Sequence, residues 1–231
     1  MGVRDLLKGA WSGIDKFFTL QVVPPPKVLY TFKGTKEVAK WRVFSDNSFG
    51  GSSAAALELS PSGKSASFSG CVSKKMTEGS ELIRSGYCGM NSVMRWNLDL
   101  QPYDFLTFRV RGDGNTYTAN IRLDQFTGGD EEAWQARLKP TKTGEWEDVH
   151  VDFKDFIFTF RGRTVQNQEA FAGMARKSVM AVGITIGASE DMEESTPFQL
   201  EVESIRADTH PLSPEEYQRR AFEGLIDGRQ Y

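Results

Sequence analysis

The middle of the chain alternates between apolar and polar residues with a period of two. Each alternating run presents one apolar and one polar face, which is typical of a half-buried antiparallel strand. Residues 179–186 are more uniformly apolar, which predicts a strand buried deep inside the fold. The alternating runs cover residues 66–72, 106–110, 117–123, 134–138, 149–153 and 198–202.

Breaks rich in Gly, Asp, Asn, Pro and Ser separate most of these runs, and no helical pattern of the kind that connects parallel strands lies between them. Many short strands with turn signals between them predict an all-β protein, either a β-sandwich or a jelly roll. The breaks lie at residues 60–64, 112–115, 128–130, 140–144 and 193–197.

The break at residues 112–115 reads Gly-Asp-Gly-Asn and joins two alternating runs. An Asp-Gly pair between two such runs predicts a tight hairpin turn, because that turn needs positive φ, which glycine adopts easily. A phosphate-binding loop would continue into a helix, whereas here a strand follows. The tripeptide Arg111-Gly112-Asp113 would serve adhesion only in a secreted protein, and charges interrupt residues 3–20, so we expect no secretory signal. We therefore interpret this segment as a corner.

The N-terminal part follows a helical pattern. Apolar positions in residues 3–18 recur in steps of three and four, which predicts an amphipathic helix. Three prolines at residues 24–26 then hold this helix away from the body. We interpret its apolar stripe as a surface that docks on a protein partner, with packing onto the chain's own body as the alternative. The stripe consists of Leu7, Trp11, Ile14 and Phe18.

The C-terminal part carries a second helix signal. Residues 213–216 read Ser-Pro-Glu-Glu, a capping box with proline at the first helical position. The predicted organisation is thus a helix and proline-rich linker at residues 1–27, a β-sandwich domain at 28–207 and a helical tail at 208–231.

Composition and charge narrow the classes of function. A net charge of −3 and a pI near 5.6 give no basic surface of the kind that binds nucleic acid. No apolar run approaches the roughly 18 to 20 residues that a membrane-spanning helix needs. We expect neither nucleic-acid binding nor a membrane span.

The residues that could bind a metal are few. Cys71, Cys88, His150 and His210 lack the short spacing of a zinc half-site. Without a secretory signal, free buried thiols are favoured over a Cys71–Cys88 disulfide, which stays open as the alternative. The acidic residues 130–132 lack the spacing of a calcium loop, and a solvated connection between strands is the better interpretation. We therefore expect no metal site.

No candidate for catalysis stands out. There is no Gly-x-Ser-x-Gly motif, no nucleophile beside a base and no pair of acids marked for glycoside hydrolysis. We expect no enzyme, no catalytic residue and no cofactor. Aromatic side chains can stack on sugar rings, which leaves a carbohydrate-binding face as an alternative to ordinary core packing. The residues concerned are Trp41, Trp96, Trp134, Trp146 and Tyr117.

Several short segments occur together in a recognisable order. They are Trp41-Arg42, Ser45-Asp46, Gly50-Gly51-Ser52-Ser53, Phe68-Ser69-Gly70, Ser85-Gly86-Tyr87-Cys88-Gly89-Met90, Tyr103-Asp104-Phe105, Arg111-Gly112-Asp113-Gly114 with Tyr117, Trp134-Gln135 and Phe160-Arg161-Gly162. With these segments, residues 28–207 resemble the complex I intermediate-associated protein 30 family, the assembly factors of mitochondrial NADH:ubiquinone oxidoreductase. The chain looks closest to the short plant-type members. It lacks the evident long presequence of the animal members, and its tail after Asp208 is not part of the family core.

The resemblance implies a galactose-binding-like jelly roll and a non-enzymatic role. It implies that the protein binds early membrane-arm intermediates of complex I until further subunits join, with membrane-arm subunits and other assembly factors as partners. Association with the membrane would then be peripheral, through the complex. The implied location is the matrix side of the mitochondrial inner membrane. The chloroplast is the alternative, because related domains occur there fused to nucleotide-binding domains. A carbohydrate-binding module, which shares the sandwich, is the alternative function.

Overall fold

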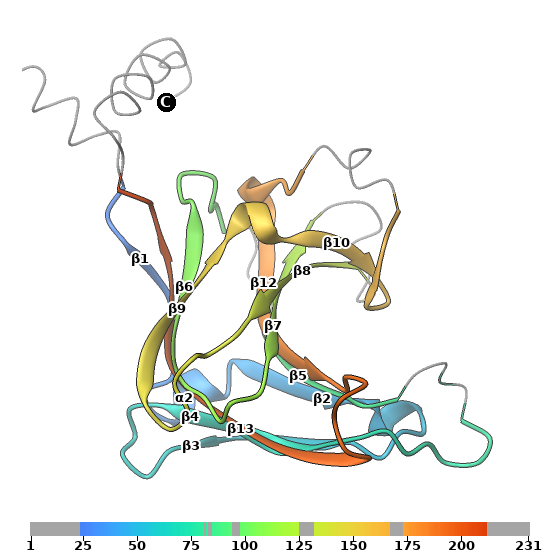
Figure 1. The fold of residues 1–231 in the computed structure, drawn as a ribbon. Coiled ribbons are helices and arrows are strands. Elements are labelled where there is room, and N and C mark those ends of the chain that lie inside the picture. The colour runs from blue at the N-terminus through green and yellow to red at the C-terminus, as the bar shows by residue number, and fades with distance from the viewer. Residues whose placement is uncertain are drawn as a thin grey trace, which may run out of the picture.

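The computed structural model describes residues 24–80, 82, 85–93, 98–124, 132–166 and 173–211. Over these residues the chain forms two antiparallel β-sheets packed face to face (Figure 1). Both predicted terminal helices, at residues 3–18 and from residue 213, lie outside the described residues. The domain boundaries proposed at 27/28 and 207/208 stay predictions.

The first sheet has six strands in the order β3-β4-β13-β6-β9, and β1 also pairs with β13. The first and last described strands therefore lie side by side, with Lys27 opposite Ala207 (Figure 1). The strands of this sheet are β1 (Lys27–Thr31), β3 (Ala54–Leu59), β4 (Ala66–Ser73), β6 (Phe105–Arg111), β9 (Trp146–Asp152) and β13 (Ser195–Asp208).

The second sheet has seven strands in the order β11-β10-β8-β7-β12-β5-β2. It is curved, with its concave side turned away from the six-stranded sheet (Figure 1). Its strands are β2 (Trp41–Ser45), β5 (Tyr87–Ser92), β7 (Tyr117–Leu123), β8 (Glu132–Leu138), β10 (Ile157–Phe160), β11 (Arg163–Thr164) and β12 (Val179–Gly187). Short helical turns are α2 (Thr35–Val38), η1 (Asp46–Phe49), η2 (Phe153–Asp155) and η4 (Arg176–Ser178).

The core lies between the two sheets and is built from the apolar sides of the alternating runs. Phe68, Phe108 and Leu200 project into it from the six-stranded sheet, while Tyr117 and Ile184 project from the other; all five are buried. Burial of these apolar side chains is the main favourable term in folding. The all-β sandwich predicted from the period of two is confirmed.

Strand β13 extends well beyond its predicted run, 198–202, because a β-bulge shifts its phase. The bulge between Val202 and Ser204 lets Ile205 and Ala207 face the core although the earlier core residues have even numbers. A bulge inserts one residue, so a pattern search with a fixed period of two stops there.

The turn at residues 112–115 is confirmed, but its predicted hairpin pairing is wrong. Strand β6 pairs with β13 and β9, whereas β7 pairs with β8 and β12 in the other sheet. The segment is therefore an arch that carries the chain from one sheet to the other. An arch and a hairpin have the same local pattern of strand, turn and strand, so the sequence could not separate them.

We expect Gly114→Val to destabilise the protein by roughly 1 to 3 kcal/mol. Gly114 has φ of 95°, a conformation that β-branched residues rarely adopt, and an added Cβ would lie 3.3 Å from Oγ1 of Thr143. Urea denaturation measures the change. The matched control is Gly187→Val in β12, where the φ is not positive and the nearest atom to an added Cβ is 3.9 Å away. Equal stability of the two variants would contradict the strain at Gly114.

Candidate interaction surfaces

The stripe predicted to bind a partner, Leu7, Trp11, Ile14 and Phe18, lies outside the described residues. The structure therefore leaves this prediction untested. Other surfaces and sites of the sandwich have to be considered from the residues that the structure describes.

Asp46 is a fully buried carboxylate with no ion pair. It accepts hydrogen bonds from the backbone N–H of Ser53 at 2.9 Å, from the Ser53 hydroxyl at 3.0 Å and from the N–H groups of Gly86 and Tyr87. Ser53 in turn accepts from the N–H of Ser73 at 2.9 Å. A buried carboxylate needs such donors in place of water. Asp46 thus joins the β2–η1 corner to the segments that precede β3 and β5.

Asp113 has a similar role at the arch. Its carboxylate accepts from the Asn115 N–H at 2.9 Å, from the Tyr117 hydroxyl at 3.0 Å and from the Gln199 N–H at 2.7 Å. Tyr117 belongs to the seven-stranded sheet and Gln199 to the six-stranded one. Burial, together with the neighbouring Asp113, raises the pKa of the Tyr117 hydroxyl, which keeps it a neutral donor. The Arg-Gly-Asp tripeptide is therefore part of a link between the sheets.

Both carboxylates come from the segments on which the family resemblance was based. Gly86 lies 40 residues from Asp46 in sequence, and Ser53 lies seven residues from it, yet both donate to the same carboxylate. Both carboxylates accept hydrogen bonds from neighbouring segments of the chain, so these motifs stabilise the fold. Sequence reasoning identified the segments but missed this convergence, since spacing along the chain does not report it.

The two cysteines are unbonded. The Cys88 thiol is buried, and its Sγ lies 3.8 Å from the backbone oxygen of Cys71. The Cys71 thiol instead contacts the carbonyl oxygen of Val72. Burial is the main cause that raises the pKa of Cys88 to about 12, and the negative charge of Asp46 and the neighbouring Cys71 add to it. Cys88 is thus an inert core thiol.

Alkylation of the native protein at mild pH should therefore modify Cys71 and spare Cys88. Only a thiolate reacts, and with a pKa of about 12 the thiolate fraction of Cys88 near pH 8 is on the order of 1 in 10⁴. Mass spectrometry should detect a single adduct before unfolding and a second adduct in denaturant. Rapid modification of Cys88 in the native protein would contradict its burial.

The aromatic residues considered for sugar binding mostly belong to the core. Trp41 packs on Tyr30 and Phe32, and Trp134 packs on Phe158. Tyr117 is 1% exposed. Trp146 is half-buried beneath the guanidinium of Arg111, and Trp96 lies outside the described residues. Core packing, the favoured interpretation, is confirmed for Trp41, Trp134 and Tyr117.

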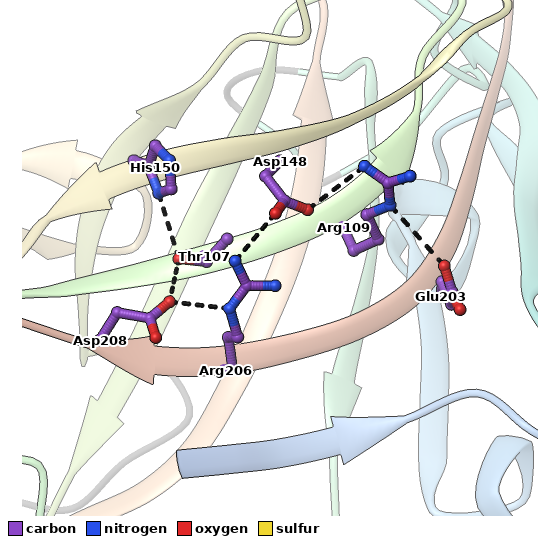
Figure 2. Close-up of polar contacts among 7 residues, drawn as sticks. All are labelled: Thr107, Arg109, Asp148, His150, Glu203, Arg206 and Asp208. Carbon is purple, nitrogen blue, oxygen red and sulfur yellow. Dashed lines mark hydrogen bonds and ion pairs between the residues drawn. The ribbon is translucent and has the colours of Figure 1, made fainter. Parts of the chain in front are cut away.

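The outer face of the six-stranded sheet carries a network of paired charges (Figure 2). Arg206 contacts Asp148 at 2.8 Å and Asp208 at 2.9 Å. Arg109 contacts the same Asp148 at 3.5 Å and Glu203 at 3.7 Å. Single surface pairs contribute little to stability, but here each cation is matched by acids of the same sheet. The charged groups of this network are therefore already paired and offer little to a charged partner.

His150 adjoins this network. Its side chain is exposed on β9, with Nδ1 3.1 Å from the Thr107 hydroxyl and the ring edge-on to Phe105 (Figure 2). The interpretation of His150 as an exposed strand histidine is confirmed.

The outer, concave face of the seven-stranded sheet has a different character. Cross-strand partners lie on the same side of a sheet, so the register defines a row of neighbours across it. That row runs Arg42, Asn91, Gly183, Asn120, Gln135 and Ile157. The Gln135 amide donates to Asn120 Oδ1 at 2.8 Å, and the Asn120 amide donates to Thr185 at 3.2 Å. Asn120 is only 5% exposed although it lies on the outer face.

Within the described residues we find no group of three or more His, Cys, Asp or Glu side chains able to hold a metal ion. Residues 130 and 131 of the acidic cluster lie outside this set. Of the helices in the described part of the chain, none is long and apolar enough to cross a membrane.

Residues 30–202 match the family model described as Complex I intermediate-associated protein 30. Three curated relatives carry the name "Complex I intermediate-associated protein 30, mitochondrial". The one from Mus musculus is 26% identical over 85% of this chain and 60% of its own length. The one from Neurospora crassa is 28% identical over 79% of this chain and 73% of its own length. The one from Drosophila melanogaster is 27% identical over 82% and 65%, respectively. The chain thus spans about two thirds of the length of these relatives.

Similar solved structures include two of family 11 carbohydrate-binding modules from Clostridium thermocellum. One, in complex with a β-1,3-1,4-mixed-linked tetrasaccharide, has a TM-score of 0.58 and 16% identity, and covers 81% of this chain and 98% of the module. The other, from a cellulosomal cellulase, has a TM-score of 0.59 and 15% identity, over 82% and 98%. Identities this low establish the fold alone. The fold is a galactose-binding-like jelly-roll sandwich, as the resemblance implied.

Proposed function

Because the chain belongs to the complex I intermediate-associated protein 30 family, we propose that it is a non-enzymatic assembly factor that binds membrane-arm intermediates of mitochondrial complex I. The observation that carries this proposal is the family match over residues 30–202. Its curated relatives are named as mitochondrial. In this proposal the protein acts on the matrix side of the inner membrane and associates with the membrane through the complex.

The environment of the acids supports a non-enzymatic role. The buried carboxylate Asp46 and the arch carboxylate Asp113 are surrounded by donors from the protein itself. A catalytic acid or base needs a free position toward a substrate. These two carboxylates instead hold the sheets and corners of a scaffold in place.

Carbohydrate binding is the weaker alternative. It rested on aromatic side chains, and Trp41, Trp134 and Tyr117 are buried in the core. The similar carbohydrate-binding modules share the fold at 15–16% identity, which says nothing of a shared ligand.

We further propose that the apolar stripe Leu7, Trp11, Ile14 and Phe18 docks in a groove of a partner subunit, with residues 24–26 as the spacer. The test deletes residues 1–22 and follows both the melting temperature and co-migration with complex I assembly intermediates from organelle membranes. Retained stability with lost co-migration supports docking.

Two other results of this test would contradict docking on a partner. If the sandwich unfolds without residues 1–22, the stripe packs on the chain's own body. If co-migration persists, another surface makes the contact. A pair of full-length variants sharpens the comparison: Leu7→Ser with Trp11→Ser should abolish co-migration, whereas Lys8→Ala with Ser12→Ala on the polar side should preserve it.

A further inference from the structure

The concave face of the seven-stranded sheet differs in charge from the face shown in Figure 2. Among the described residues of its strands, no carboxylate shares the concave face, as the register and burial of these strands show. Two exposed arginines, Arg42 on β2 and Arg137 on β8, lie on it without an ion pair in the part of the chain that the structure describes. The arginines shown in Figure 2 are paired with acids of their own sheet, whereas these two have no ion pair among the described residues.

The concave face also carries unused hydrogen-bonding groups. The Asn91 side chain lies directly over Gly183, where an added Cβ would come 1.9 Å from its Oδ1, and the amide has no hydrogen-bonding partner among the described residues. Neighbouring Asn120 and Gln135 are already bonded to each other. An unpaired amide in a recessed row offers one donor group and one acceptor to a bound chain.

An aromatic ring lies at one side of the row. The Phe44 ring contacts Gly89, since a Cβ added at Gly89 would lie 2.2 Å from its Cζ, and the side chain remains 36% exposed. Gly89 is followed across the sheet by Thr185, Thr118 and Arg137. The face thus combines an exposed ring, an amide row and two unmatched arginines.

We propose that this concave face, defined by Arg42, Phe44, Asn91, Asn120, Gln135 and Arg137, binds an acidic segment of a protein partner in extended conformation. That the partner is a protein rests on the proposed function. That the bound segment is acidic follows from charge complementarity with the two arginines. From β2 to β8 there are four steps between neighbouring strands. At about 4.8 Å each they span about 19 Å along the sheet, the length of about six extended residues.

The two arginines therefore fit two carboxylates about six residues apart in the bound segment. Arginine suits this task because its planar guanidinium binds a carboxylate through two parallel hydrogen bonds. The free amide of Asn91 would pair with a backbone amide of the segment, and Phe44 would cover an apolar or flat group beside it.

The first test titrates the full-length protein with a short synthetic peptide of glycine and serine carrying two glutamates about six residues apart. The side-chain amide resonances of Asn91, Asn120 and Gln135 report binding at the site itself. These resonances should shift with the glutamate peptide, and should stay unchanged with the same peptide carrying glutamine. Equal shifts with both peptides would overturn the role of charge.

The matched variants reverse charges on opposite sheets. Arg42→Glu with Arg137→Glu should weaken peptide binding by at least about tenfold. Lys27→Glu with Lys64→Glu makes the same change in net charge on exposed residues of the six-stranded sheet and its turn, and should leave the affinity unchanged. All four positions are exposed, so both proteins should fold, which the melting temperature verifies. Equal affinities of the two variants would overturn the proposal.

A neutral mixed-linked glucan oligosaccharide tests the alternative ligand. If the same amide resonances shift with this sugar and not with the glutamate peptide, the face is a carbohydrate site and the proposal is overturned.

Co-migration with complex I intermediates separates this inference from the proposed function. Loss in the arginine variant alone supports the concave face as the docking surface. Co-migration of both variants overturns that surface while the assembly role stands. Failure of the unchanged protein to co-migrate overturns the assembly role, and the peptide titration then decides the face independently.

Discussion

Replacing Asp46 by alanine is expected to lower the free energy of unfolding by roughly 3 to 5 kcal/mol. The change removes the acceptor of three backbone N–H groups, those of Ser53, Gly86 and Tyr87, at a site with no exposed surface. Each buried donor left without an acceptor costs about 1 to 3 kcal/mol, partly relieved if water enters the space. Urea denaturation measures the loss.

The control for this experiment is Glu58→Ala. Glu58 is an exposed acid on β3 without a partner, so its loss should change stability by less than about 0.5 kcal/mol. Asp46→Asn adds a second comparison, because it keeps the size of the side chain but turns one acceptor into an NH₂ group facing N–H donors. A stable Asp46→Ala protein would mean that the corners at Ser53 and Gly86 hold without the carboxylate.

Replacing Asp113 by alanine should give the second large effect, a loss of roughly 2 to 4 kcal/mol. The carboxylate is the acceptor for the buried hydroxyl of Tyr117 and for the N–H of Gln199, which belong to different sheets. Its removal leaves the Tyr117 hydroxyl without its acceptor inside the core and, among the described residues, leaves the arch held to β13 only by the Asn115 amide, which donates to the Pro197 carbonyl at 3.4 Å. The effect should be smaller than at Asp46, since Asp113 is only half-buried.

A double-mutant cycle with Tyr117→Phe isolates the link between the sheets. Tyr117→Phe should cost about 1 to 2 kcal/mol in the natural sequence and clearly less when Asp113 is already alanine. Simple additivity of the two losses would show that the hydroxyl and the carboxylate do not stabilise one another, and the arch would then be held by its backbone alone.

Individual strands could be predicted from the sequence where the period of two is unbroken. The run at 117–123 coincides with β7, because Tyr117, Ile121 and Leu123 all face the core in one phase. Strand β5 was not predicted, since its core positions Cys88 and Ser92 are small or polar and its outer ones include a glycine. The bulge in β13 hid the rest of that strand, because the apolar positions change phase there.

The candidate surfaces were less predictable than the strands. Arg42 and Arg137 are ordinary polar positions of two separate runs, and no local signal connects residues 95 positions apart. They meet on one face because β5, β12 and β7 lie between β2 and β8 in the sheet. Likewise, Asp113 was predicted as a turn residue, but its bond to Gln199 depends on β13 passing beside the arch.

By itself the sequence determined the strands with an unbroken apolar pattern, the turns between them and the family to which the protein belongs, because side-chain periodicity, glycine at positive φ and the ordered motifs are all local properties. The tertiary structure decided which strands pair, that residues 112–115 cross between sheets, and that Ser53 and Gly86 both bond to Asp46. It also decided that Arg109 and Arg206 pair with acids of their own sheet, while Arg42 and Arg137 on the other sheet have no ion pair among the described residues. These are contacts between residues far apart in the chain, and their free energy depends on strand order and register, which no local pattern specifies.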